Sequence, residues 1–244
     1  MKMKKTLSLP GIGTFTVTRN IRSKGIKISV HHKRGVSVTI PLFCSYSDAS
    51  MFVQQKRDWI ENALHKQTEK AKRFETPLEN GSIIHLINGS IILVQLEPPT
   101  TNPNKQNPSV TIKRSANGFS VHAQSGLPRE LLVKGINRAV RESAKEYIPE
   151  RVKLLSRSTG LVPEKIYLKN NKTNWGSCSA KGNINLNIHL MRLPSILCDY
   201  VILHELAHLR HPNHGKEFHE FVNQLCLGRE REFAKALKGY RPVI

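Results

Sequence analysis

Residues 204–208 read His204-Glu205-Leu206-Ala207-His208, and this stretch decides how the rest of the chain is interpreted. On a helix, His204 and His208 are four residues apart, so both imidazoles project from one face. Two histidines at this spacing can bind one zinc ion. Glu205 lies round the helix from them, where it can reach water beside the ion without being a ligand. The pattern therefore predicts Glu205 as the general base of a hydrolase.

A catalytic zinc site usually has three protein ligands and one open position. His211 lies seven residues after His204, about 10.5 Å along an unbroken helix, which is too far for one shared ion. Pro212 ends the helix, so that His214 can approach the ion from another direction. We predict His214 as the third ligand of a single Zn²⁺. Carboxylates further along are the alternatives, namely Glu217, Glu220, Glu230 and Glu232.

Two other interpretations of the motif are less consistent with the sequence. A purely structural role would bury two histidines without a partner among the apolar residues of the helix, which are Val201, Ile202, Leu206 and Ala207. The spacing of the three histidines is also that of the metzincin motif, H-E-x-x-H-x-x-G-x-x-H. Residue 211, however, is histidine where that motif has glycine, and no Met-turn follows.

The composition is that of a globular chain with a large positive charge. It has 244 residues, with 38 Lys and Arg against 18 Asp and Glu, a formal charge of +20. No apolar run approaches 18 residues and no signal peptide is evident, so we predict a cytoplasmic protein that does not enter a membrane. The four cysteines form no C-x-x-C pair, which excludes a cysteine-based zinc ribbon.

Residues 1–127 are predicted to form a β-rich N-terminal region. Period-two alternation predicts strands at 15–18, 26–30 and 36–40, followed by a helix from Asp48 to Phe74 with Ser47 as its N-cap. A second group of strands spans 81–123. It is interrupted at 97–108, where four prolines among twelve mostly polar residues predict a loop.

Residues 128–244 are predicted to form a second, more helical domain. A long helix spans Pro128–Ser158, and a short strand covers Lys165–Leu168. Two further strands flank a glycine turn between 174 and 188. A buried helix then begins near Pro194 and leads into the histidine motif. The whole chain is predicted to have an α+β fold.

The residues around the motif resemble those of the YgjP-like metallopeptidase family, which is related to the SprT-like zinc proteases. The resemblance is dense over about residues 170–225, where 175–179, 184–187, 193–194, 199–209 and 213–218 carry it, and it extends more weakly to the N-terminal strands and to 56–60. It implies a zincin-like core with an active-site helix and a small sheet. It also implies zinc held by the residues at 204, 208 and 214, with Glu205 as catalytic base for peptide hydrolysis.

Several residues near the motif are candidates for contact with a protein or peptide substrate. We expect the strand at 184–188 to lie beside the active-site helix, and in zincins an edge strand pairs with extended substrate. Asn185 and Asn187 share one face of this strand and could line a cleft. Trp175 is either a packing residue or a substrate contact. Cys178 is either a redox-active or inhibitory zinc ligand or a buried structural thiol, and the candidate oxyanion stabilisers are Asn174, Tyr200 and His219.

The positive charge leaves a second function open. A charge of +20 suits contact with nucleic acid, so a non-catalytic or DNA-associated zinc module acting on nucleoprotein is the alternative. Against it, the chain has no helix-turn-helix, zinc-finger spacing or RNP-type aromatic run. A hydrolase of other amides is a third possibility, since attack by zinc-activated water is common to both reactions.

Overall fold

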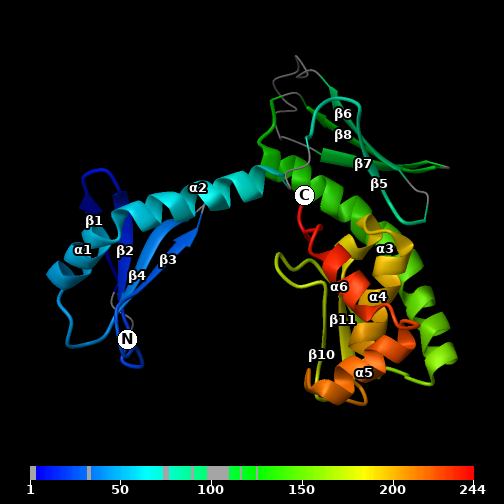
Figure 1. Cartoon of the computed structure of the whole chain (residues 1–244). Coiled ribbons are helices and arrows are strands. Elements are labelled where there is room, and N and C mark those ends of the chain that lie inside the picture. Colours follow the sequence, from blue (N-terminus) through cyan, green and yellow to red (C-terminus); the bar gives the residue numbers. More distant parts are fainter. Residues whose placement is uncertain are drawn as a thin grey trace. The chain divides into compact units, whose positions relative to one another are not determined.

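The computed structural model describes residues 4–31, 34–73, 77–88, 91–97, 110–115, 117–124 and 126–244. The chain divides into two compact units, Met1–Glu75 and Thr76–Ile244 (Figure 1). Each unit has its own hydrophobic core. The predicted mixed α+β class is confirmed, whereas the zincin-like core stays a prediction. None of the described helices is both long and apolar enough to span a membrane.

The first unit is a four-stranded sheet covered on one face by two helices. The strands follow the order β1-β2-β4-β3, with β2 and β4 parallel and the outer pairs antiparallel. Buried Phe15, Val17 and Val38 pack against Ala49 and Val53 because they alternate with polar residues along their strands. The elements are β1 Lys4–Leu9, β2 Gly13–Arg19, β3 Lys27–His31, β4 Gly35–Ile40, α1 Tyr46–Gln55 and α2 Arg57–Arg73.

The single helix predicted from Asp48 onwards is two helices, α1 and α2, separated at Lys56. The prediction of Ser47 as N-cap is wrong, because Ser45 caps α1. The Asp48 amide donates to Ser45 Oγ at 3.0 Å, and the Ser45 amide donates to the Asp48 carboxylate at 2.8 Å. This reciprocal pair satisfies two amides that a helix N-terminus otherwise leaves free. Phe74, the predicted end of the helix, lies outside the described residues.

The second unit begins with a sheet in the order β5-β6-β8-β7, formed by β5 Ser82–His85, β6 Ile91–Glu97, β7 Val110–Ser115 and β8 Gly118–Gln124. Phe119 and Val121 of this sheet share one core with Ile136 and Ala139 of α3, which spans Arg129–Thr159. The unit boundary therefore falls at 75/76 and not at the predicted 127/128. Of the predicted loop at 97–108, the structure describes only Glu97, the last residue of β6.

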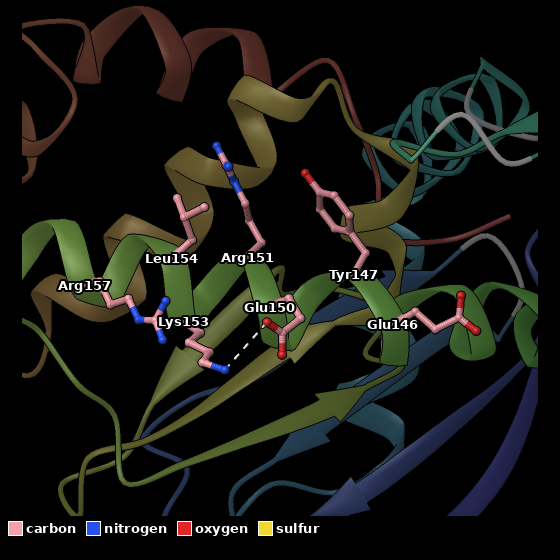
Figure 2. A pocket seen from close by; sticks show the side chains of 7 residues that line it. All are labelled: Glu146, Tyr147, Glu150, Arg151, Lys153, Leu154 and Arg157. Carbon is pink, nitrogen blue, oxygen red and sulfur yellow. Dashed lines mark ion pairs between the residues drawn. The ribbon is translucent and has the colours of Figure 1, made fainter.

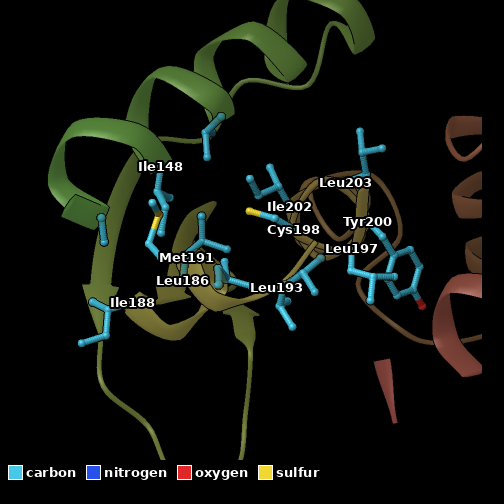
Figure 3. Close-up of a cluster of buried hydrophobic side chains, with 14 of the residues drawn as sticks. Ile148, Leu186, Ile188, Met191, Leu193, Leu197, Cys198, Tyr200, Ile202 and Leu203 are labelled. Carbon is cyan, nitrogen blue, oxygen red and sulfur yellow. The ribbon is translucent and has the colours of Figure 1, made fainter. Parts of the chain in front are cut away.

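The remaining elements of this unit continue the same core. They are β9 Lys165–Lys169, β10 Gly176–Cys178, β11 Asn183–Asn187, a 3-10 turn at Ile188–Arg192, α4 Ser195–Ala207, α5 Lys216–Leu225 and α6 Glu230–Leu237. The 3-10 turn, α4 and β9 pack on α3, whereas α5 and α6 pack on α4. Ile148 of α3, Leu186 of β11 and Ile202 of α4 lie in the same buried cluster (Figure 3). Arg151 binds Asp199 with two hydrogen bonds of 2.6 and 2.5 Å, which ties α3 to α4.

The three strands of this part form a small sheet in the order β10-β11-β9. Strand β11 is central: it runs antiparallel to β10 and parallel to β9. Strand β11 is therefore not an edge strand. This contradicts the expectation that residues 184–188 offer a free edge for pairing with substrate. The edge strand that packs beside α4 is β10.

Candidate functional site

Helix α4 carries the histidine motif in its last turn. It begins after Pro194 and ends at Ala207, and His208 is its C-cap, still with helical backbone angles of φ −63° and ψ −19°. The helix is buried on almost every side, which explains its nearly continuous apolar sequence. His204 and His208 thus lie on one face, as the spacing predicts.

The three histidines predicted as ligands converge on one point. One ring nitrogen from each of His204, His208 and His214 lies within 4.8 Å of the others. The Nε2 atoms of His204 and His214 are 3.1 Å apart. After α4 the chain makes one more turn, in which the amide of His211 donates to the carbonyl of Ala207 at 3.0 Å. This turn, next to Pro212, brings His214 to the helical pair.

These imidazoles have the chemistry that a metal ion requires. Burial, followed by the neighbouring His208, His214 and His219, lowers the pKa of His204 to about 4. Burial also lowers the pKa of His208. The Nδ1–H of His208 donates to the carbonyl of His211 at 3.1 Å, which leaves Nε2 with a free lone pair. Three imidazoles with convergent ring nitrogens suit Zn²⁺, so the residues present fit the ion.

Phe218, the third residue of α5, packs against all three histidine rings. Its side chain is completely buried, and its ring centroid lies 4.9 Å from that of His204, 4.4 Å from His208 and 4.8 Å from His214. The ring of His208 stacks on it with an interplanar angle of 23°. In the sequence, Phe218 is one of several apolar residues in the segment that follows the motif, with Phe221, Val222 and Leu225. No local signal marks a residue that touches all three histidines.

Glu205 lies on the inner side of α4, next to β10. Its side chain is buried, and Oε2 has no hydrogen-bond partner within the described part of the chain. Burial raises the pKa of Glu205 to about 7. A carboxyl group with this pKa can take up and release a proton near neutral pH, which is what acid–base catalysis needs.

The alternative metal ligands have other partners. Glu230 is buried and accepts a hydrogen bond of 2.6 Å from Nδ1–H of His219. Glu232 is bonded to Arg229 at 2.9 and 2.7 Å. Glu220 lies 3.6 Å from Lys216, and Glu217 lies 3.8 Å from His211. Within the described ranges, none of these carboxylates joins the histidine cluster.

The structure separates the candidate substrate residues. Asn187 is buried, and its Nδ2 donates to the carbonyls of Asn171 and Asn174 at 2.7 and 2.9 Å, while its Oδ1 accepts from the amide of His189. The prediction that Asn187 lines a cleft is therefore wrong. Asn185 is partly exposed and bonds Ser177 Oγ at 3.1 Å. Trp175 is partly buried and packs against the core.

The candidate oxyanion stabilisers also have different surroundings. Tyr200 is buried between His204 and Phe233, with ring centroids 6.1 and 5.9 Å away, and burial raises its pKa to about 12. His219 is exposed and lies 6.3 Å from His214 between ring centroids. Asn174 is exposed. For Cys178, burial and then the charge of Glu205 raise the pKa of the thiol, which disfavours the thiolate that a metal would bind.

A surface pocket lies on α3. None of the residues that line it is one of the three clustered histidines. Figure 2 shows the seven side chains that line it, including Tyr147 and Leu154, and the pair between Lys153 and Glu150 at 3.8 Å. All seven come from α3, and none belongs to the histidine cluster. We assign this pocket no part in the chemistry of the site.

Comparison with known proteins gives one extensive match. The family model described as "YgjP-like, metallopeptidase domain" matches residues 24–238. No curated protein matches the chain. The metallopeptidase zymogen of Pyrococcus abyssi abylysin is 21% identical, with a TM-score of 0.34 over 37% of this chain and 92% of that chain. The zymogen of Methanocaldococcus jannaschii jannalysin is 25% identical, with a TM-score of 0.32 over 38% and 98%.

Proposed function

The chain belongs to the YgjP-like metallopeptidase family, and we propose that it hydrolyses peptide bonds with one zinc ion held by His204, His208 and His214. The observation that supports this most directly is the convergence of three ring nitrogens within 4.8 Å, next to a buried carboxyl group. A location in the cytoplasm and a zincin-like arrangement of the core are parts of the same proposal.

Each residue of the site has a distinct task in this proposal. A bound zinc ion supplies a Lewis acid that polarises the scissile carbonyl and makes water more acidic. Glu205 accepts the proton of the attacking water and gives it to the leaving amine. The carbonyl of His211 holds His208 in the tautomer that presents Nε2. Phe218 restrains the three rings through its contacts.

The substrate is proposed to be an extended protein or peptide segment. Strand β10 pairs with β11 on one side, and its other side pairs with no strand within the described ranges. Gly176 of β10 adjoins Glu205, so a peptide added along this strand would run close to the catalytic carboxyl group. Main-chain hydrogen bonds at such an edge tolerate many side chains.

The proposal is tested with the full chain loaded with one equivalent of zinc. The protein is incubated with a peptide mixture and with denatured casein, and cleavage products are identified by mass spectrometry. We expect cleavage that stops with a chelator, returns with zinc, and is lost in Glu205→Gln. Zinc binding at these histidines without cleavage of any peptide would instead favour the non-catalytic zinc module. Cleavage of small amides alone would contradict a peptidase.

A further inference from the structure

The beginning of the chain has an unusual distribution of charge. The first 47 residues contain nine Lys and Arg but no Asp or Glu, and the first carboxylate of the chain is Asp48. Asp48 lies in α1, so the four strands of the first unit carry no acidic side chain. The positive charge of this unit is therefore not neutralised from within its own sheet.

One face of this sheet is uniformly polar. Cross-strand neighbours share a face, so the pairing of the four strands defines two complete rows. The first row is Lys4, Thr18, Thr39 and Lys27, and the second is Thr6, Thr16, Ser37 and Ser29. Ser8 and its neighbour Thr14 extend the same face. We call these ten residues the hydroxyl face.

The hydroxyl face is open to solvent. All ten of its residues are exposed or partly exposed, whereas the residues between them, such as Phe15 and Val38, are buried under α1 and α2. Neither Lys4 nor Lys27 pairs with a carboxylate anywhere in the described part of the chain. By contrast, Lys5 and Arg19 contact the ring of Tyr46 at 5.1 and 4.8 Å.

Further positive charge borders the first row. The turn between β2 and β3 contains Arg22 and Lys24, both exposed. This turn leads directly into Lys27, at the end of the sheet where the row of two lysines lies. With strands about 4.8 Å apart, the row from Lys4 to Lys27 spans roughly 14 Å. The sheet thus presents a continuous array of hydroxyl and ammonium donors that contains no carboxylate.

We propose that the hydroxyl face binds the phosphodiester backbone of a nucleic acid, without reading its base sequence. Ser, Thr and Lys side chains are typical donors to phosphate oxygens, and contacts to phosphate carry no sequence information. The face has no Phe, Tyr or Trp, so it offers no platform on which bases could stack. It likewise lacks the apolar side chains that a membrane surface would take up.

Binding of nucleic acid at the hydroxyl face does not depend on the proposed peptidase activity. The hydroxyl face lies in the first unit, and the histidines lie in the second. Charge alone does not distinguish the two units, since basic residues are present in both. What distinguishes the first unit is the absence of carboxylates from a continuous, exposed row of donors. The interaction can therefore be tested by substitutions that leave the metal site unchanged.

The experiment measures binding of the full chain to labelled 30-nucleotide single strands and 30-base-pair duplexes of mixed sequence. Fluorescence anisotropy is recorded between 50 and 300 mM salt. We expect binding that weakens steeply with salt. In K4Q/K27Q, the slope of log affinity against log salt should fall by roughly 0.7–0.9 for each lysine lost. T16V/T18V, which keeps the branched shape of both side chains, should also weaken binding.

The matched control is K235Q/K238Q, which removes the same charge from exposed positions at α6. We expect this variant to bind nucleic acid nearly as well as the wild type. An equal loss in both lysine variants would overturn the proposal, because net charge alone would then explain binding. The proposal also fails if K4Q/K27Q binds like the wild type, or if polyglutamate competes as strongly as nucleic acid. Peptidase activity measured without nucleic acid should be unchanged in K4Q/K27Q.

Discussion

Gly176 of β10 lies directly against Glu205 of α4. A Cβ atom placed on Gly176 would lie 2.6 Å from both Cγ and Oε1 of Glu205. The carboxyl group is thus held between its own helix and the backbone of an edge strand. This contact explains why a residue without a side chain stands at 176, since any larger residue would occupy the space that Glu205 fills.

Gly176→Ala is expected to displace Glu205 and lower catalytic turnover while zinc stays bound. Overpacking of this kind typically costs about 1–3 kcal/mol. Peptidase kcat, metal content and thermal stability are measured together. Gly25→Ala, where a Cβ meets no atom within 4 Å, is the matched control and should leave all three close to wild type. An alanine at 176 that lowers stability but not kcat would show that the contact serves folding alone.

Glu205→Gln should lower kcat by about 10²- to 10⁴-fold, the usual contribution of a general acid–base group. The amide has nearly the same shape, so it keeps the packing but cannot accept and return a proton. Zinc content, measured by mass spectrometry of the digested protein, should stay at one ion per chain. Unchanged turnover in this variant would contradict the proposed role of Glu205.

His214→Ala should lose both zinc and activity if His214 is the third ligand. His211→Ala is the control on the same turn, and it should retain zinc, because the described contact of His211 with His208 uses the backbone carbonyl. Zinc affinity is measured by competition with a coloured chelator. If His214→Ala retains zinc and a carboxylate variant such as Glu217→Gln loses it, that carboxylate and not His214 is the third ligand.

His189 should make folding sensitive to acid. Its side chain is buried, and burial together with the charge of Arg192 lowers its pKa to about 3. An unfolded histidine has a pKa near 6.5, so between these values the unfolded state binds more protons. Stability is therefore lost as pH falls below about 6.5, by roughly 2 kcal/mol from this residue between pH 7 and pH 5.

This prediction is tested by comparing wild type with His189→Gln. Denaturant unfolding is measured in the presence of a chelator, so that release of metal does not contribute. The variant is expected to lose less stability than the wild type over the same pH interval, whatever its stability at pH 7. Parallel pH profiles for the two proteins would show that His189 does not have the lowered pKa.

Local signals in the sequence predicted the elements that depend on near neighbours. The long helix α3, the strand β9 and the buried helix α4 all follow from periodicity within a short segment. The N-cap of α1 was missed because Ser45 and Ser47 are both suitable residues. Only Ser45 has an acidic residue three positions later, and this reciprocal bond with Asp48 decides the helix start.

Contacts between distant segments decided what local patterns could not. The sheet of β5–β8 resembled a continuation of the N-terminal strands, but Phe119 and Val121 pack on α3 and place it in the second unit. The local pattern of β11 does not distinguish an edge strand from a central one, and only its pairing with β9 and β10 makes it central. A strand pattern records which residues face a core, but it does not record which strands lie on either side.

The sequence by itself determined that His204 and His208 share one helix face with Glu205 beside them, because this spacing is a local property of 3.6 residues per turn. It also indicated His214, since a proline at 212 cannot continue a helix, although α4 already ends at Ala207. Only the tertiary structure decided how these groups are held. Phe218 meets all three rings, and Gly176 meets Glu205, through contacts between segments that no local spacing specifies. Such contacts depend on how whole elements pack, because burial, not residue order, brings their side chains together.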